Sequence, residues 1–323
     1  MCSHPDIFFI EPTNVCDLKC EMCPTNREMR RPKGHMKMGV FKAIVDYIAE
    51  VHPNETCFIN MWGWGEPLLH ESIFDMIEYA SQGNIRTRLS TNLNAVTDAQ
   101  IDAICSSALD SVIIGLDGIH GSSHEAYRTG SNFSRLKRNM ETLVCRKREG
   151  TKGGPNIIVT TLVTSFSQNE VSEIVEYCRQ IGVDALLLKY PNMWRDKKSD
   201  AAVRHIYDKF IRNVTIGSRY TMDTHGAIRS IEGDCPFAEM NGIFLCDGRL
   251  TVCCFDYDGE NSLGAVTDAR SVQDIYNSPI WHAAKRRMSD KEFGTCATCD
   301  SCGPRREVFL FGKDGDDTFL SGL

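Results

Sequence analysis

The chain lacks any long apolar run. None of its hydrophobic segments approaches the ~18 consecutive residues that a membrane-spanning helix needs. Its N-terminus has neither the basic nor the apolar region of a secretory signal. Basic charge is not in excess either, because 36 Lys and Arg stand against 43 Asp and Glu and give a net charge of −7. These absences argue against a membrane protein, a secreted protein and a general nucleic-acid binder. They predict a cytoplasmic protein.

Cysteine, in contrast, is abundant, with 15 cysteines among 323 residues. In a secreted chain such a count would suggest disulfides. In a chain without an export signal, a large and odd number of cysteines favours metal ligands and reactive thiols in a reducing compartment. The length corresponds to about two domains.

Strand-like and helix-like patterns alternate through the first two thirds of the chain. The predicted strands are 7–10, 57–62, 86–91, 111–116, 157–163 and 185–189. The predicted helices are 41–51, 73–80, 99–105, 133–147 and 171–181, with a further helical segment at 201–214. Such alternation predicts an α/β fold built from βαβ units around a parallel sheet. Six units are too few for a closed eight-stranded barrel.

Three cysteines follow the first predicted strand. Cys16, Cys20 and Cys23 have the spacing C-x3-C-x2-C. Iron–sulfur clusters are usually held by four cysteines, and a set of three leaves one iron open, as catalytic metal sites do. The alternative is a structural zinc site, but zinc knuckles favour C-x2-C pairs that a second pair completes. No such pair follows soon, so the pattern favours an open iron–sulfur cluster.

This cysteine loop resembles the signature of the radical S-adenosylmethionine (radical SAM) superfamily. The resemblance implies a partial (β/α)6 TIM barrel and a [4Fe–4S] cluster whose fourth iron is chelated by SAM. One electron then cleaves SAM to a 5′-deoxyadenosyl radical, which abstracts hydrogen from the substrate. An external one-electron donor such as flavodoxin or ferredoxin is implied as a partner.

Two loops carry residues that the resemblance places on the methionine and adenine parts of SAM. The backbone of Met22 would lie along the adenine. After the second predicted strand, Gly65 would let the backbone approach the methionine part, and Glu66 would accept a hydrogen bond from the SAM ammonium group. A turn with Gly and Pro is common anywhere, so this motif gains its weight from its position.

Three further residues are assigned to SAM in the same way. Ser90 and Asn92 follow the third predicted strand, where the family contacts the ribose hydroxyls, although a helix N-cap turn would also use these residue types. Arg128 matches the family's Tyr-Arg element and would pair with the SAM carboxylate through its fork of donors. A bare arginine is more often a solvated surface charge. Gly115 replaces the serine that is usual in this family.

A second cysteine set resembles the C-terminal SPASM/Twitch extensions of the family. The resemblance implies one auxiliary [4Fe–4S] cluster, and its ligands would be Cys235, Cys253, Cys296 and Cys299. Cys254 could replace Cys253, and Cys302 could replace Cys299. A zinc ribbon is the alternative, because two cysteine pairs also make a tetrahedral zinc site.

The second auxiliary cluster of a full SPASM domain is not expected. Arg305 and Phe309 stand where its further cysteines would be. We therefore predict a radical SAM partial barrel at 1–225, a small Twitch/SPASM-like iron–sulfur domain at 226–310 and a tail at 311–323.

The substrate is less constrained than the radical chemistry. Relatives with a single auxiliary cluster include dehydrogenases and epimerases that act on aminocyclitols and sugars. Because the first predicted strand begins by residue 7, no N-terminal peptide-recognition segment is expected. We therefore predict a small, polar, carbohydrate-like substrate that is epimerised or dehydrogenated. The alternatives are a radical SAM maturase that modifies a peptide and a non-catalytic iron–sulfur or zinc scaffold.

Epimerisation would need a thiol that returns a hydrogen atom to the substrate radical. The candidate donors are Cys178, Cys246, Cys254 and Cys302. Dehydrogenation would instead use the auxiliary cluster as the electron acceptor. A buried free cysteine is more often a small hydrophobic residue, so each candidate has a plain structural interpretation. Formation of 5′-deoxyadenosine would separate an enzyme from a scaffold, and a dedicated peptide partner would identify a maturase.

Overall fold

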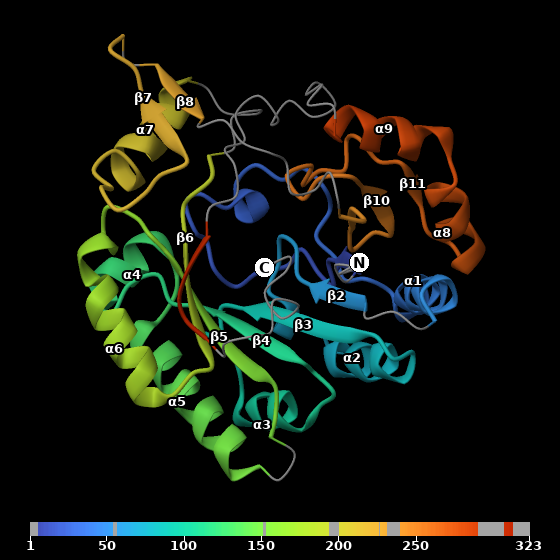
Figure 1. Cartoon of the computed structure of the whole chain (residues 1–323), viewed down its shortest axis with the longest axis horizontal. Coiled ribbons are helices and arrows are strands. Elements are labelled where there is room, and N and C mark those ends of the chain that lie inside the picture. The colour runs from blue at the N-terminus through green and yellow to red at the C-terminus, as the bar shows by residue number, and fades with distance from the viewer. Residues whose placement is uncertain are drawn as a thin grey trace.

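The fold is built on one curved sheet with helices on its outer side (Figure 1). The computed structural model describes residues 6–53, 57–150, 153–193, 200–225, 227–230, 240–289 and 307–312. Within them, neighbouring strands follow the order β11-β10-β9-β1-β2-β3-β4-β5-β6-β12. The six central strands are parallel: β1 (Asp6–Ile10), β2 (Cys57–Met61), β3 (Arg86–Thr91), β4 (Ser111–Gly115), β5 (Asn156–Leu162) and β6 (Ala185–Lys189).

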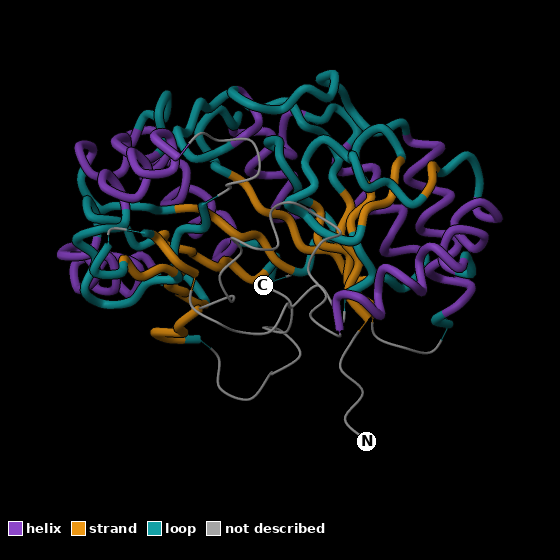
Figure 2. The backbone as a smooth tube through the Cα atoms, turned by 90° about the horizontal axis from the view of Figure 1, so that it is seen from above, coloured by secondary structure: helices purple, strands orange, loops and turns teal. Residues whose placement is uncertain are grey.

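The connecting helices cover the outer face of these strands. They are α1 (Met38–Val51), α2 (Ile73–Gln82), α3 (Asp98–Ser106), α4 (Gly121–Tyr127), α5 (Phe133–Glu149) and α6 (Val171–Ile181). Short 3-10 turns lie at Pro24–Asn26, Pro67–Leu69 and Gln168–Glu170. Local sequence sets the helix ends, since Thr97 forms a capping box on α3 and Gly182 ends α6 at a φ of +83°. In Figure 2 the strands run through the middle of the molecule and the helices lie around them.

Alternation along the strands separates two layers of side chains. Ile10, Leu89 and Val159 belong to the main core under the helices. Ile113 and Ile158 point the other way, into a smaller cluster on the inner face of the sheet. A curved parallel sheet with helices on its outer side and side-chain clusters on its inner face is a partial barrel, so the predicted fold class is confirmed.

The C-terminal part adds strands to both edges of this sheet. β9 (Ile243–Phe244) pairs in parallel with β1, followed by antiparallel β10 (Arg249–Thr251) and β11 (Gly264–Ala265). β12 (Glu307–Phe311) pairs antiparallel with β6. α8 (Ala269–Tyr276) packs on α1, where Tyr276 stacks on Tyr47 with ring centroids 5.4 Å apart. α9 (Pro279–Ser289) follows.

A separate unit stands above the sheet on the β6 side, opposite α8 and α9 (Figure 1). It consists of α7 (Asp200–Phe210) and a hairpin of β7 (Tyr220–Met222) and β8 (Ile228–Ser230). The predicted boundary at 225/226 falls between the paired strands of this hairpin, and that at 310/311 falls inside β12. Both predicted boundaries therefore fall inside structural units rather than between them. The division into domains stays a prediction. Among the described helices, none has the length and apolarity that crossing a bilayer requires.

Candidate active site

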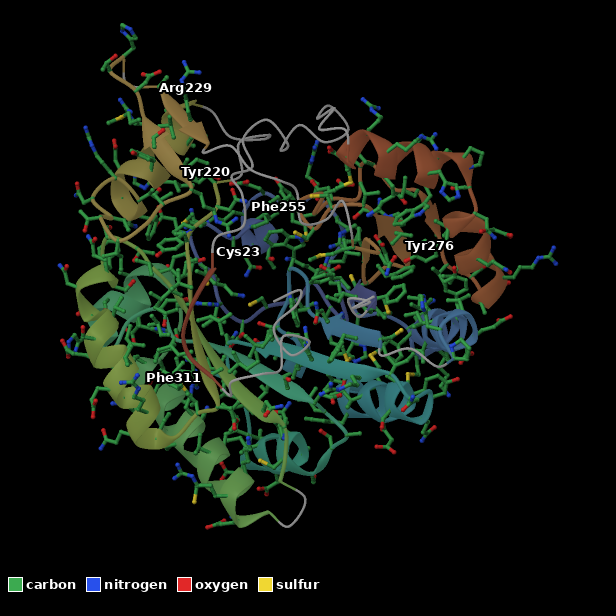
Figure 3. The ribbon with its side chains drawn as sticks, in the orientation of Figure 1. Cys23, Tyr220, Arg229, Phe255, Tyr276 and Phe311 are labelled. Atoms are coloured by element: carbon green, nitrogen blue, oxygen red, sulfur yellow. The ribbon has the colours of Figure 1, made fainter. Side chains whose placement is uncertain are left out.

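The predicted cluster loop lies after β1, at the C-terminal edge of the parallel strands. Cys20 is buried, whereas Cys16 and Cys23 are half-buried, and the Cys23 amide donates to the Cys20 carbonyl at 3.1 Å. Burial raises the pKa of the Cys16 thiol to about 12 and that of Cys20 to about 11. The free thiols of Cys16 and Cys20 are therefore protonated, and metal binding would displace their protons. In the view of Figure 3, Cys23 lies near the centre of the molecule, below Tyr220 and Phe255.

The spread of the three thiols suits a cluster. Within the described ranges, no group of three or more His, Cys, Asp or Glu side chains converges on a single metal ion. Each cysteine of an iron–sulfur cluster binds a different iron, so its ligands need not converge on one point. The donor set, all sulfur and partly open to solvent, fits that chemistry.

The two residues between Cys20 and Cys23 are both held by the α7 unit. Glu21 accepts hydrogen bonds from His205, at 2.8 Å, and from Lys209 of α7. The Met22 side chain is 3% exposed and packs with Phe210 and its neighbours in a cluster of its own. No local sequence pattern predicts this contact, because residues nearly two hundred positions apart form it. The α7 unit therefore fixes the geometry of the loop.

We expect Lys209→Met to loosen this loop. Lys209 is partly exposed, so the lost ion pair corresponds to ~1 kcal/mol, or about fivefold in the rate of cluster loss. The measurement is the decay of the iron–sulfur absorbance under an iron chelator. Arg212→Met is the matched control, because Arg212 lies just beyond α7 and pairs with Asp208 instead. Equal decay in both variants would show that α7 does not hold the loop.

The loop after β2 packs directly on the cluster loop. A Cβ at Gly65 would lie 2.2 Å from the Thr13 carbonyl oxygen and 2.8 Å from that of Val15. The next amide, of Glu66, donates to the same Val15 carbonyl at 2.8 Å. The chain's own backbone therefore requires glycine at position 65, a reason separate from the close approach of SAM that the family resemblance implies.

Glu66 joins the loops after β2 and β3. One carboxylate oxygen accepts from the Leu68 amide at 3.1 Å and the Thr91 hydroxyl at 2.7 Å, and the other accepts from the Asn92 amide at 2.7 Å. Burial raises the pKa of Glu66 to about 7 despite these donors. The Asn92 side chain donates to Asp17, beside Cys16, at 2.8 Å. The structure thus brings Glu66 and Asn92 together at the cluster loop.

Ser90 lies half-buried on β3, two residues before Asn92. It alternates with Leu89, which belongs to the outer core, so it faces the inner side of the sheet. Arg88 faces the same way, fully buried with its guanidinium 3.9 Å from the centroid of the Phe58 ring. The polar inner face near Ser90 was not predicted, because a strand arginine usually lies at a surface.

Arg128 reaches the mouth of the barrel over Gly115. Its Nε donates to Asp117 at 2.5 Å, and a Cβ at position 115 would lie 2.3 Å from one guanidinium nitrogen. Glycine replaces the family's serine here because Arg128 occupies that space. His124 accepts from the Asp117 amide at 3.2 Å, and burial lowers the His124 pKa to about 4. The neutral ring therefore positions the Asp117–Arg128 pair.

The predicted auxiliary ligands are only partly described. Cys235, Cys296, Cys299 and Cys302 lie outside the described residues. Cys253 follows β10, is 8% exposed and accepts from the Phe255 amide at 3.3 Å. Cys254 is half-buried and packs with Phe9 and Trp62 on the inner side of β1.

Two of the candidate hydrogen donors, Cys178 and Cys246, are buried. Cys178 is fully buried on α6, in the core outside the sheet, so the sheet separates it from the inner face. This position does not favour Cys178 as a donor, and its assignment stays a prediction. Cys246 is 6% exposed, and its sulfur accepts from Arg31 at 3.2 Å. It belongs to a buried polar contact between the barrel and the C-terminal segment.

Sequence comparisons agree with this geometry. Residues 10–178, more than half of the chain, match the radical SAM superfamily. The tungsten-containing aldehyde ferredoxin oxidoreductase cofactor-modifying protein of Pyrococcus furiosus is 27% identical over 180 residues, 56% of this chain and 50% of that protein. The chain thus spans half the length of this relative. Mycofactocin maturase MftC of Mycobacterium tuberculosis is 21% identical over 306 residues, 90% of this chain and 75% of that protein.

Solved structures share the fold. Native anSMEcpe with bound AdoMet has a TM-score of 0.64 at 17% identity and covers 93% of this chain and 89% of its own. BtrN in complex with AdoMet and 2-DOIA has a TM-score of 0.58 at 13% identity, and the match covers 94% of this chain and 95% of BtrN. Streptococcus suis SuiB bound to the precursor peptide SuiA has a TM-score of 0.59 at 14% identity, and the match covers 93% of this chain and 71% of SuiB.

The C-terminal part has a family match of its own. Residues 235–303 match the SPASM iron–sulfur cluster-binding domain. The predicted cofactors, SAM with its [4Fe–4S] cluster and auxiliary iron–sulfur binding, are those of the matched families. The chain belongs to the radical SAM superfamily and carries a C-terminal SPASM domain.

Proposed function

We propose that this radical SAM enzyme is a maturase that modifies a peptide. The bound cofactors supply a 5′-deoxyadenosyl radical that abstracts hydrogen from a carbon of the substrate. The observation that carries the proposal is the match to mycofactocin maturase over 90% of the chain, which takes in the barrel and the C-terminal domain together. SuiB, of the same fold, is bound to a precursor peptide. These relationships favour the peptide alternative over the carbohydrate-like substrate.

A small polar substrate remains the second candidate. The observation that favours it is BtrN, whose complex with 2-DOIA matches this chain over 95% of BtrN's length. A sugar- or aminocyclitol-type substrate would then be epimerised or dehydrogenated.

The test uses the reconstituted enzyme with SAM, a reductant and a low-molecular-mass cell extract. We expect the extract to stimulate 5′-deoxyadenosine formation, and we expect prior protease digestion of the extract to remove the stimulation. A stimulation that survives digestion would reject the peptide proposal and favour the small substrate. Reaction in deuterated water then identifies the outcome, because a product that gains solvent deuterium indicates a thiol donor.

Cys254 is the candidate donor that the described residues support best. It lies with Trp62 on the inner side of β1, whereas Cys178 lies outside the sheet. Cys254→Ala should remove the deuterium from the product and leave SAM binding unchanged.

We propose that Glu66, Asn92 and Arg128 hold SAM at the strand ends. Glu66 then faces the SAM ammonium group, as the family resemblance implies. A nearby cation lowers the pKa of a carboxyl, so SAM binding releases a proton from Glu66 at pH values below about 7. SAM affinity should therefore rise with pH, by about fivefold between pH 6 and 7 and by about a further twofold above pH 7 before it levels off.

Titration of SAM into the cluster-loaded enzyme at several pH values measures this dependence. In Glu66→Gln the affinity should be weaker and nearly independent of pH over the same range. A pH dependence that is the same in Glu66→Gln would place the ammonium group elsewhere.

A further inference from the structure

Trp64 connects the cluster loop to the segment that carries Cys253 and Cys254. Its indole Nε1 donates to the Cys254 carbonyl at 2.7 Å, and its ring packs edge-on against Tyr257 with centroids 5.8 Å apart. Its backbone carbonyl accepts from the Thr25 hydroxyl. One residue thus contacts both cysteine-bearing segments through opposite ends.

The Thr25 end of this connection leads to a predicted cluster ligand. Thr25 lies two residues after Cys23, and its hydroxyl oxygen is 3.3 Å from the Cys23 sulfur. At the indole end, Trp64 bonds to the carbonyl of Cys254, and Cys253 is the preceding residue in the chain. Bonded and hydrogen-bonded atoms therefore run without a gap from Cys23 through Trp64 to Cys253 and Cys254.

A buried ion pair holds the two segments in register around Trp64. Arg31 and Glu11 pair at 2.7 Å with side chains 1% and 0% exposed. Glu11 also accepts from the amides of Trp64, at 3.1 Å, and Cys246, at 2.9 Å. Arg31 Nε donates to the Tyr257 carbonyl at 2.9 Å. A buried pair satisfied in this way is costly to break, so the contact of Trp64 with Cys254 is fixed.

We infer that electrons pass between the SAM-site cluster and the auxiliary cluster along the bonds and hydrogen bonds of Trp64. Trp64 acts by linking the two cysteine-bearing segments and does not react itself. Electron tunnelling decays less steeply along bonds and hydrogen bonds than across empty space. One electron leaves one cluster and enters the other, while Trp64 itself is neither oxidised nor reduced and no proton moves. The inference requires Cys253 or Cys254 as an auxiliary ligand, and it holds for either class of substrate.

Trp64→Phe tests the path, because it retains the aromatic contact with Tyr257 and removes the Nε1 donor. The enzyme with both clusters loaded is given less than one electron equivalent, and rapid freeze-quench EPR follows redistribution between the two cluster signals. We expect redistribution at least about tenfold slower in Trp64→Phe, with iron content and midpoint potentials unchanged. Trp281→Phe, which removes an indole that packs on Tyr276 in the same domain, should redistribute at the original rate.

Thr25→Val interrupts the same path at its other end and leaves Trp64 in place. It should slow redistribution as well, which keeps the test decisive if Trp64→Phe fails to load its clusters. Unchanged redistribution in the loaded Thr25→Val or Trp64→Phe enzyme would overturn the inference. Equal slowing in Trp281→Phe would overturn it too, because the effect would then not depend on the path. Neither result bears on the peptide proposal, since no substrate is present.

Discussion

Replacing Cys16, Cys20 and Cys23 together with alanine should abolish SAM cleavage and leave the fold intact. On the predicted assignment these three thiolates are the protein's whole share of the SAM-site cluster, so their loss should leave nothing to hold its irons. The loop keeps its other anchors, because the Lys19 amide donates to the Thr129 carbonyl at 2.8 Å and Glu21 remains paired with α7. Iron content should fall from about eight to about four per chain, the remainder belonging to one auxiliary cluster.

Iron analysis and 5′-deoxyadenosine formation measure this effect. The matched control replaces Cys105 and Cys145, which lie half-buried and exposed on α3 and α5, with alanine. These changes should alter neither quantity. SAM cleavage that persists in the triple variant would contradict the assignment of the loop. About one zinc beside about four irons in the unaltered enzyme would instead reject the auxiliary cluster.

Gly65→Ala should be the most damaging single substitution at the site. The new methyl group would lie 2.2 Å from the Thr13 carbonyl oxygen, and backbone on both sides leaves it no room to move. The loop after β2 would move away from the cluster loop, and Glu66 would lose its contact with Asn92. We expect a loss of about 3 kcal/mol or more in the free energy of unfolding, together with loss of SAM binding.

Thermal unfolding and SAM titration of the loaded enzyme measure the two losses. Gly39→Ala in α1 is the control, because nothing lies within 4 Å of the Cβ it would add. It should stabilise the helix slightly, by up to ~1 kcal/mol. A Gly65→Ala enzyme with normal stability and normal SAM affinity would show that the loops do not pack as described.

The repetitive part of the fold was predictable because its signals are local. β3, β6 and α6 have the predicted bounds, since buried strands and amphipathic helices reveal their periods over a few residues. The cysteine loop was predictable for the same reason, as its spacing lies within eight residues. The family resemblance indicated Glu66 and Asn92, and both residues follow parallel strands, whose C-terminal ends carry the site in barrels of this kind.

Long-range contacts were not predictable. β9 pairs with β1 and so attaches the C-terminal segment to the barrel, but the two strands are far apart in the chain and no local pattern indicates their pairing. The contacts of Trp64 with Cys254 and of Glu21 with α7 join residues far apart in the chain, and no local signal marks such pairs. Cys178 illustrates the same limit, because a helix cysteine looks the same in sequence whether it faces a substrate or a core.

The central claim is that Cys16, Cys20 and Cys23 hold a cluster with one iron open to SAM. EPR of the reduced enzyme tests it most directly in a variant without Cys235, Cys253, Cys296 and Cys299, which leaves only this cluster. We expect one [4Fe–4S]⁺ signal whose g-values shift when SAM is added and do not shift with 5′-deoxyadenosine at the same concentration, because 5′-deoxyadenosine lacks the amino and carboxylate groups that could chelate the iron. A signal that SAM leaves unchanged, or no iron–sulfur signal in a folded variant, would contradict the account.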